Sequence, residues 1–443
     1  MHTLERLKRG ELAGTTRLDL SEDLDIFPTE IFQLADTLEV LNLSGNRLSR
    51  LPDDLHRLHR LRILFCSNNA FTEVPSVLGR CARLEMVGFK ANQIQRLPAE
   101  ALPPSLRWLI LTDNRLETLP AEIGQCHRLQ KLMLAGNRLQ ALPQALARCE
   151  RLELLRVAAN RLPALPGWLL EMPRLTWLAF GGNPFSDAME DDILAAHPLP
   201  PVARDDVALG PVLGQGASGT IYQAQWRRAD GLQPMAAKLF KGNVTSDGLP
   251  HSEMAASLSA GAHPNLIPVA GPLATAEDEL PGLLMALIDP AFAALAGPPS
   301  FETCTRDCYA PERRFAADEV LRIAASVADV VHHLHGRGIL HGDLYAHNLL
   351  VAPGGQTLLS DFGAASFHDP RGAQAAALQR LEARAFGCLL EELLGHCDVA
   401  GRDLRLQALT DLKRHCLADA PADRPDFAML QRTIRQLLDK AAE

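Results

Sequence analysis

A segment of the form LxxLxLxxNxLxxLP recurs along the first 185 residues, and no other feature of the sequence limits the fold so strongly. The repeating positions are spaced 23 residues apart, with one step of 22. They are the leucines Leu38, Leu61, Leu84, Leu106, Leu129, Leu152 and Leu175 and the asparagines Asn46, Asn69, Asn92, Asn114, Asn137, Asn160 and Asn183. With a degenerate earlier unit around Leu18, eight coils stack. A fixed period of this length predicts a solenoid, because each unit buries its apolar side against its neighbours.

Within each unit, the residue types fit one coil of such a solenoid. Alternate leucines such as Leu41 and Leu43 point into the core, because strand side chains alternate between faces. The repeated asparagine can bond backbone groups of the neighbouring turns. Proline pairs such as Leu51-Pro52 then hold the return segment extended. These features resemble the leucine-rich-repeat family, which implies one short strand per repeat along a horseshoe.

The outward positions of the predicted strands are more apolar than a soluble surface requires. Those we expect to bind a protein partner are Phe65, Met86, Trp108, Ile110, Met133 and Trp177. Single exposed apolar residues are normal on a protein surface. The repeat, however, places these side chains beside one another on one concave ladder, and a contiguous apolar patch usually marks a partner site.

A glycine-rich stretch, LGQGASGTI, spans residues 213–221 and is the first signal of a nucleotide-binding site. Alone, a GxGxxG motif could also open a dinucleotide-binding fold. Here a strand-like segment follows, and then Met235-Ala236-Ala237-Lys238. This order is similar to the glycine-rich loop and strand lysine of protein kinases.

The stretch GILHGDLYAHNLLV at residues 338–351, followed by Asp361-Phe362-Gly363, strengthens the resemblance to protein kinases. The resemblance implies that Asp343 orients or deprotonates the acceptor hydroxyl and that Glu253 holds Lys238 against the phosphates of ATP. It also implies that Asn348 and Asp361 bind magnesium. A catalyst for this reaction must gather hard cations on carboxylate and amide oxygens, since ATP carries concentrated negative charge.

The same resemblance implies a nucleotide pocket under the glycine-rich loop. Adenine would lie between Ile221 and Ala236 on one side and Leu350 on the other, with Met285 guarding the back. The expected nucleotide-binding residues are Leu213, Gly214, Gly216, Ser218, Gly219, Ile221, Ala236, Lys238, Met285 and Leu350.

Three departures from the kinase pattern keep other functions open. Gly342 replaces the arginine before the catalytic aspartate, Tyr345 stands where serine/threonine kinases often carry lysine, and only 21 positions separate Asp361 from Glu382. A nucleotide-binding pseudokinase scaffold and a small-molecule kinase resembling aminoglycoside phosphotransferases are therefore alternatives. The retained Lys, Glu, Asp, Asn and Asp set favours an active enzyme, and the joined repeats favour protein substrates. Without a cationic receiver at position 342, activity should not depend on phosphorylation of Ser366, the one hydroxyl in the shortened segment.

We therefore predict an ATP- and magnesium-dependent serine/threonine protein kinase of bacterial-like type. Its fold class would be an α/β leucine-rich-repeat solenoid over residues 1–200 and an α+β two-lobed kinase-like domain over residues 204–443. A net charge of −9 without a long Lys/Arg run gives no reason to expect nucleic acid or an anionic membrane as partner. No membrane span is expected, and nine scattered cysteines suit a reducing compartment, so we expect a cytoplasmic protein.

Overall fold

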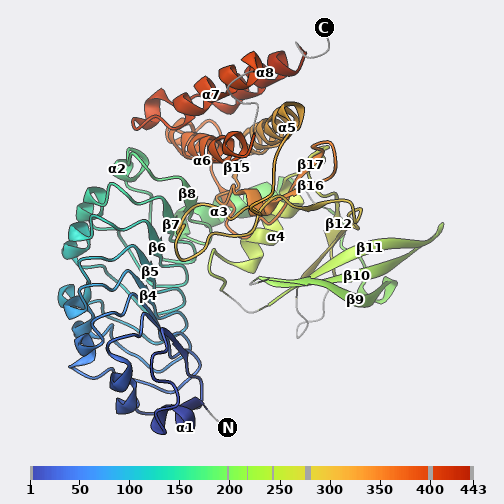
Figure 1. The fold of residues 1–443 in the computed structure, drawn as a ribbon. Coiled ribbons are helices and arrows are strands. Elements are labelled where there is room, and N and C mark those ends of the chain that lie inside the picture. The colour runs from blue at the N-terminus through green and yellow to red at the C-terminus, as the bar shows by residue number, and fades with distance from the viewer. Residues whose placement is uncertain are drawn as a thin grey trace. The chain divides into compact units, whose positions relative to one another are not determined.

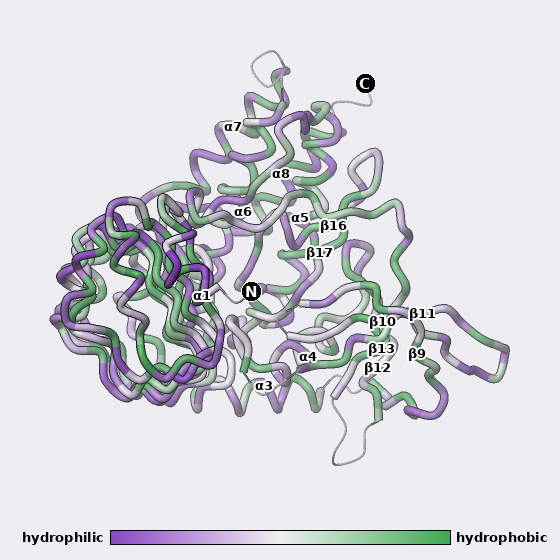
Figure 2. Tube along the Cα trace, turned by 60° about the horizontal axis from the view of Figure 1, so that its bottom comes forward, coloured by the Kyte–Doolittle hydropathy of each residue, from purple (hydrophilic) through white to green (hydrophobic). Residues whose placement is uncertain are grey.

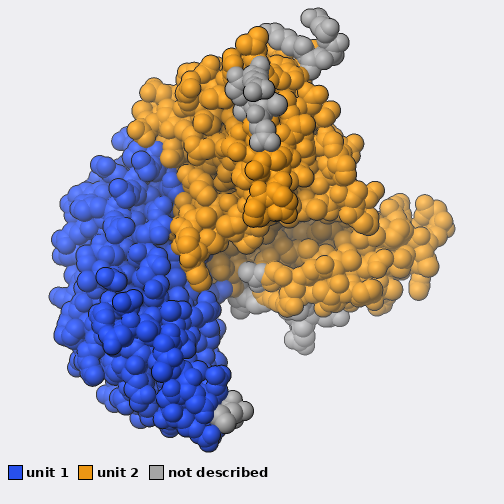
Figure 3. Space-filling view, in the orientation of Figure 1, with its two compact units in different colours: residues 1–175 blue, residues 176–443 orange. Residues whose placement is uncertain are grey.

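The computed structural model describes residues 3–196, 199–216, 218–241, 244–274, 281–397 and 403–439. His197 and Pro198 of the proline-rich junction and Ala217 of the glycine-rich stretch lie outside these ranges. The chain divides into two compact units, Met1–Leu175 and Thr176–Glu443 (Figure 3). The division thus falls within the eighth repeat, directly after its leading residue Leu175. A domain boundary near residue 200 stays a prediction.

The first unit is a stack of coils, each with a short strand and, in most coils, a 3₁₀ helix on the opposite side (Figure 1). Its strands are β1 (Arg17–Asp19), β2 (Val40–Asn42), β3 (Ile63–Phe65), β4 (Met86–Gly88), β5 (Trp108–Ile110), β6 (Lys131–Met133) and β7 (Leu154–Arg156). Its helices are α1 (Thr3–Lys8), η1 (Thr29–Leu34), η2 (Leu55–Arg57), η3 (Ser76–Arg80), η4 (Ala99–Ala101), η5 (Ala121–Gln125), η6 (Gln144–Arg148) and α2 (Gly167–Leu170). In Figure 2 hydrophobic and hydrophilic stretches alternate around these coils.

The strands form one parallel sheet in which equivalent residues of successive repeats pair. Leu64 pairs with Leu41 on one side and with Val87 on the other, and this central row is buried. The predicted asparagine bonds are confirmed. Asn137, for example, donates from Nδ2 to the carbonyls of Leu111 and Leu134, at 2.8 and 2.9 Å. Each such amide ties one coil to the coil before it, so a buried polar side chain stabilises the stack.

The outer rows of the sheet differ from the expected open ladder. Phe65, Trp108, Ile110 and Met133 are half-buried, whereas Met86 and Trp177 are 1% exposed. Trp108 donates from Nε1 to Met133 Sδ at 3.3 Å, and Lys131 Nζ lies 4.5 Å from its ring centroid. The expectation that Met86 and Trp177 offer open apolar surface is therefore wrong. For Trp177 the reason lies in the second unit, where its ring packs on Tyr345.

The second unit opens with β8 (Trp177–Ala179) and α3 (Pro184–Ala196), followed by an antiparallel five-stranded sheet in the order β12-β13-β11-β10-β9. These strands are β9 (Val207–Gln215), β10 (Gly219–Arg228), β11 (Gly231–Phe240), β12 (Val269–Pro272) and β13 (Gly282–Ala286), with η7 (Arg204–Asp206) leading in and α4 (Pro250–Ser259) between β11 and β12. Alternate residues Met235 and Ala237 of β11 are buried in one apolar cluster with Leu284 of β13.

A helical part follows. It comprises α5 (Ala317–Gly336), α6 (Ala375–Gly395), α7 (Leu404–Cys416), η9 (Pro421–Asp423) and α8 (Phe427–Asp439), with short strands β14 (Ala293–Ala294), β15 (Ile339–Leu340), β16 (Leu349–Val351), β17 (Thr357–Leu359) and β18 (Ser366–Phe367) and turn η8 (Ala346–Asn348). Apolar residues at helical spacing decide the packing. In α8, Phe427, Leu430, Ile434 and Leu437 form one buried stripe, which faces α5. No helix in the described parts of the chain is long and apolar enough to cross a membrane.

Candidate phosphotransfer site

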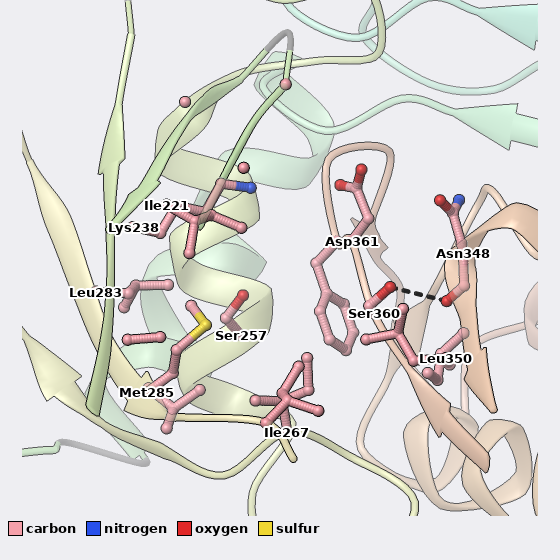
Figure 4. A pocket seen from close by; sticks show the side chains of 18 of the residues that line it. Ile221, Lys238, Ser257, Ile267, Leu283, Met285, Asn348, Leu350, Ser360 and Asp361 are labelled. Atoms are coloured by element: carbon pink, nitrogen blue, oxygen red, sulfur yellow. Dashed lines mark hydrogen bonds between the residues drawn. The ribbon is translucent and has the colours of Figure 1, made fainter. Parts of the chain in front are cut away.

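A cavity of about 780 Å³ lies between the five-stranded sheet and the short strands β16 and β17 (Figure 4). All ten residues that the sequence predicts for nucleotide binding line it. Ile221, Ala236 and Met285 come from β10, β11 and β13, and Leu350 faces them from β16. The lining is apolar along these strands and becomes polar near Lys238 and Asp361, an arrangement that suits a flat apolar base joined to a charged group.

Lys238 of β11 and Glu253 of α4 form an ion pair at the polar end of the cavity, with side chains 12% and 4% exposed. Burial raises the pKa of Glu253 above its ordinary range. The Lys238 ammonium opposes this shift, and the charge of Asp361 adds to it. The pair therefore fixes the lysine at the wall of the cavity while a second carboxylate stands nearby.

The glycines at the adjoining ends of β9 and β10 and in the loop between them serve two purposes. A Cβ atom on Gly214 or Gly216 would meet nothing within 4 Å, so these positions keep the backbone open toward the cavity. A Cβ on Gly219 would lie 2.4 Å from the Leu239 carbonyl oxygen, so glycine is required there for β10 and β11 to pair. The open backbone at this wall suits a bulky anion.

Asp343 and Asn348 are joined within the loop that follows β15. Asn348 donates from Nδ2 to the Asp343 carbonyl oxygen at 2.9 Å and to Asp343 Oδ2 at 2.8 Å. Its Oδ1 oxygen remains as the atom able to bind a cation. The neighbouring Ser360 hydroxyl donates to the Asn348 carbonyl at 2.9 Å, which ties this loop to the strand before Asp361.

A second pair, Asp307 and His347, supports the same loop and was not predicted from the sequence. The Asp307 carboxylate accepts from the His347 backbone at 2.9 Å and lies 2.8 Å from His347 Nδ1. Burial lowers the pKa of His347, but the bond and charge of Asp307 and the charges of Asp343 and Asp361 outweigh it, so the pKa is raised. A protonated His347, with Nε2 4.0 Å from Asp343 Oδ2, would offset negative charge at the site.

Glu382 of α6 holds the loop that carries Asp343. Gly342 donates its backbone N–H to Glu382 Oε1 at 2.7 Å, and His335 Nε2 lies 2.6 Å from Oε2. Burial alone would raise the pKa of Glu382. The bond and charge of His335, with contributions from His341 and Gly342, lower it instead. The ionised Glu382 carboxylate thus binds the backbone directly before Asp343.

The predicted metal ligands Asn348 and Asp361 line the same cavity from neighbouring segments (Figure 4). Asp361 has a φ of 55°, a left-handed conformation that is uncommon for residues other than glycine and concentrated at functional sites. Within the described ranges, no group of three or more His, Cys, Asp or Glu side chains could hold a metal. These two oxygen donors fit Mg²⁺ shared with substrate phosphates, which is how Mg²⁺ is commonly bound.

Comparisons with known proteins agree with this geometry. Residues 207–382 match the family described as protein tyrosine and serine/threonine kinase, and residues 37–58 and 104–162 match leucine-rich-repeat families. The chain joins leucine-rich repeats to a protein-kinase domain. The predicted fold class is therefore confirmed.

The relatives match parts of the chain at modest identity. "Probable inactive serine/threonine-protein kinase roco10" from Dictyostelium discoideum is 36% identical over 122 residues, 26% of this chain and 5% of that protein. Fibroblast growth factor receptor 1 from Xenopus laevis is 27% identical over 202 residues, 42% of this chain and 24% of the receptor. "Leucine-rich repeat and calponin homology domain-containing protein 1" from Mus musculus is 34% identical over 126 residues, 28% and 18% respectively. The chain thus spans a quarter or less of each relative.

The helix α4, which carries Glu253 of the kinase domain, rests on a buried acid of α3. Glu190 Oε2 accepts from the Ser252 hydroxyl at 3.1 Å. Burial raises the pKa of Glu190 from its ordinary 4.5 to about 7, the Ser252 bond opposes the shift, and the charges of Asp187 and Asp191 add to it. Since the folded-state pKa is raised, the contribution of Glu190 to stability is complete below pH 4.5 and is lost as pH rises through 7.

Glu190→Gln should therefore stabilise the protein above pH 7, because glutamine keeps the shape without the buried charge. We expect the free energy of unfolding to rise by up to roughly 3 kcal/mol at pH 8, with almost no difference near pH 4.5. Melting curves at several pH values measure this. Asp192→Asn, which removes an exposed carboxylate of the same helix, is the control. An equal gain at pH 4.5 and pH 8 would contradict the assignment.

Proposed function

We propose that the kinase domain transfers the γ-phosphate of ATP to a serine or threonine hydroxyl of a protein. The observation that carries this proposal is the Lys238–Glu253 ion pair, which faces Asn348 and Asp361 across one cavity while Asn348 also binds Asp343. The five groups come from distant parts of the sequence. Four of them line one cavity and the fifth, Asp343, is bonded to Asn348, which is the grouping that phosphoryl transfer requires, because that chemistry depends on positioning and on charge stabilisation.

When bound, ATP would supply the phosphoryl group and Mg²⁺ would neutralise part of its charge. Lys238 would bind the phosphates, held in place by Glu253. Asp343 would accept the hydroxyl proton of the acceptor, with Asn348 keeping its carboxylate in place. The apolar walls at Ile221 and Leu350 would hold the base and exclude water.

A transfer assay tests this function. Purified full-length protein is incubated with γ-labelled ATP, magnesium and a mixture of dephosphorylated proteins, and the phosphorylated amino acids are identified. Label on serine or threonine supports the proposal. Label on tyrosine alone would overturn the residue class, and label on added aminoglycosides alone would overturn the protein substrate.

A scaffold that binds nucleotide without transfer is the second candidate. It is favoured by Gly342 and Tyr345 and by the name of the Dictyostelium relative. Millimolar ATP with magnesium should raise the melting temperature under both readings, because a ligand that binds only the folded state stabilises it. A thermal shift without label in the transfer assay identifies the scaffold, and no shift contradicts both readings.

We also propose that the repeat unit binds a protein partner through the ladder formed by β3 to β6, in the reducing cytoplasm. Phe65, Trp108, Ile110 and Met133 are half-buried on this ladder and retain contact area for a partner. Large aromatic side chains dominate interface energetics. All nine cysteines are free thiols, which suits that compartment.

Trp108→Asp should weaken partner capture without unfolding the repeats. A central aromatic residue contributes about 2 kcal/mol or more, so affinity should fall on the order of 30-fold. The measurement compares proteins retained by the wild type, by Trp108→Asp and by the control Trp168→Asp in α2. Retention of the same proteins in the same amounts by Trp108→Asp and the wild type would rule out this surface.

A further inference from the structure

The three departures from the kinase pattern lie against a single neighbour, the segment of residues 176–196 that contains β8 and α3. We call it the docking segment. It belongs to the same compact unit as the kinase site. Three of its contacts involve the residues and the segment that depart from the kinase pattern, so the departures are parts of one structural feature.

The first contact is made by Trp177. Its indole ring stacks on Tyr345, with ring centroids 4.1 Å apart and an interplanar angle of 9°, and its Nε1 donates to the Leu344 carbonyl at 3.1 Å. The Arg306 guanidinium lies 5.5 Å from the ring centroid of Trp177. Leu344 and Tyr345 directly follow Asp343. Trp177 therefore holds the backbone and the side chain of the residues that present the proposed base.

The second contact explains Gly342. Its φ is +72°, and a Cβ atom there would lie 2.4 Å from the Ala364 carbonyl oxygen and 2.9 Å from that of Leu178 in β8. No side chain fits between these two carbonyls. The position that carries arginine in the resembled family is thus closed by the docking segment and by the residues after Asp361.

The third contact is made by Ser366, in the shortened segment after Asp361. The Ser366 hydroxyl accepts backbone N–H groups of Phe180 at 2.9 Å and Gly181 at 3.2 Å, and the side chain is fully buried. Ser366 also pairs with Leu340 in the two-stranded sheet that leads into the catalytic loop. A phosphate could not be added here without breaking these bonds.

The docking segment also reaches the other half of the site through α3. Glu190 accepts from Ser252 of α4, and Leu194 packs against the apolar cluster that contains Leu258 of the same helix. Helix α4 carries Glu253, which holds Lys238. One continuous segment thus contacts the catalytic loop, the segment after Asp361 and the helix of the ion pair.

We propose that residues 176–196 order the phosphotransfer site permanently, in place of a phosphorylated loop, and that Trp177 is the positioning residue for the catalytic loop. This inference rests on the proposed function. Trp177 is not among the residues that line the described cavity, and it contacts the catalytic loop at Leu344 and Tyr345. Its loss should lower kcat and leave nucleotide binding unchanged, which a general loss of folding would not do.

The test uses the full-length chain and four variants. Trp177→Ala removes the stack and Trp177→Phe keeps a ring. Tyr345→Leu removes the stack from the other side, and Trp226→Ala makes the same change on β10, where the side chain packs on a different apolar cluster. We measure kcat, KM for ATP, the thermal shift with ATP and magnesium, and amide exchange over residues 341–349.

We expect Trp177→Ala and Tyr345→Leu to lower kcat at least 10-fold with KM for ATP within 2-fold. Exchange over 341–349 should accelerate at least 10-fold in both. Trp177→Phe should retain at least half of kcat, and Trp226→Ala should match the wild type in kcat and exchange. Phosphatase treatment of the wild type should leave kcat unchanged.

Wild-type kcat and exchange in both Trp177→Ala and Tyr345→Leu would overturn the positioning role while leaving the kinase function intact. Loss of activity on phosphatase treatment would overturn the permanent ordering. If the wild type transfers no phosphate, the proposed function fails, and exchange alone decides the positioning role. Faster amide exchange in Trp177→Ala, with the thermal shift by ATP and magnesium retained, then supports the positioning role. Unchanged exchange overturns it.

Discussion

Lys238→Met should lower the rate of phosphate transfer by on the order of 10²- to 10³-fold, the effect of removing one preorganised charge donor from an active site. Lys238 is the one lysine among the residues that line the described cavity, so no neighbouring lysine of that lining can replace it. The control is Lys241→Met, the same change three residues farther along, outside the residues that line the cavity.

The variant should also be less stable, because Glu253 would lose its partner while remaining 4% exposed. Leaving one partner of a buried ion pair uncompensated costs about 3–5 kcal/mol, and protonation of the carboxylate lowers this cost. Burial already raises the pKa of Glu253, and loss of the Lys238 ammonium, which opposes that shift, would raise it further. The double variant Lys238→Met/Glu253→Gln removes the charge altogether.

The double variant separates an effect on stability from an effect on phosphate transfer. We expect it to recover the melting temperature of the wild type and to remain as inactive as Lys238→Met. Transfer at more than a tenth of the wild-type rate by either variant would show that Lys238 is not the phosphate-binding group. If Lys241→Met were inactive as well, the loss of activity in Lys238→Met would come from damage to the β-sheet and not from loss of a phosphate-binding group.

The resemblance to protein kinases, carried by short sequence motifs, was enough to predict which residues line the cavity. The glycine-rich loop, Lys238 and Leu350 each lie in a short run with its own pattern, and these runs line one cavity. The repeat likewise predicts strand positions, because a 23-residue period places Leu41 and Leu64 in equivalent, paired positions. These features depend on neighbours in the sequence or on a fixed period.

The residues that the sequence did not reveal act across long separations. Asp307 lies in a loop without a motif, 40 positions before His347, and nothing in its surroundings in the sequence indicates a partner. Trp177 has the repeat register of an outward residue. The register states which way a side chain points and not what packs on it, so the stack on Tyr345 could not be predicted.

The departures at Gly342 and Tyr345 illustrate the same limit. From the sequence they indicate lost function, because each replaces a charged residue of the resembled family. In the structure Gly342 fits between two carbonyl oxygens and Tyr345 is covered by an aromatic ring. A missing charge can therefore mean a different neighbour, which only the tertiary contacts reveal.

Asp343→Asn should lower kcat by on the order of 10²- to 10⁴-fold, the usual contribution of a positioned general base. Asparagine is nearly isosteric and can still accept the bond from Asn348 Nδ2, so the loop should keep its conformation. Asp343 is not among the residues that line the cavity, and the thermal shift with ATP and magnesium should therefore match the wild type. The control, Asp411→Asn, removes a carboxylate of α7 that pairs with Arg414 at the surface.

His347 provides a second readout that does not depend on activity. The charge of Asp343 is one of the causes that raise the pKa of His347, so Asp343→Asn should lower that pKa, and NMR titration of the imidazole measures the change. Asp307 should keep part of the upward shift, because its bond to Nδ1 is unaffected. A lowered His347 pKa together with unchanged kcat would show that Asp343 stands beside His347 but is not the base. An unchanged pKa would mean that the two groups do not face each other as the structure has them.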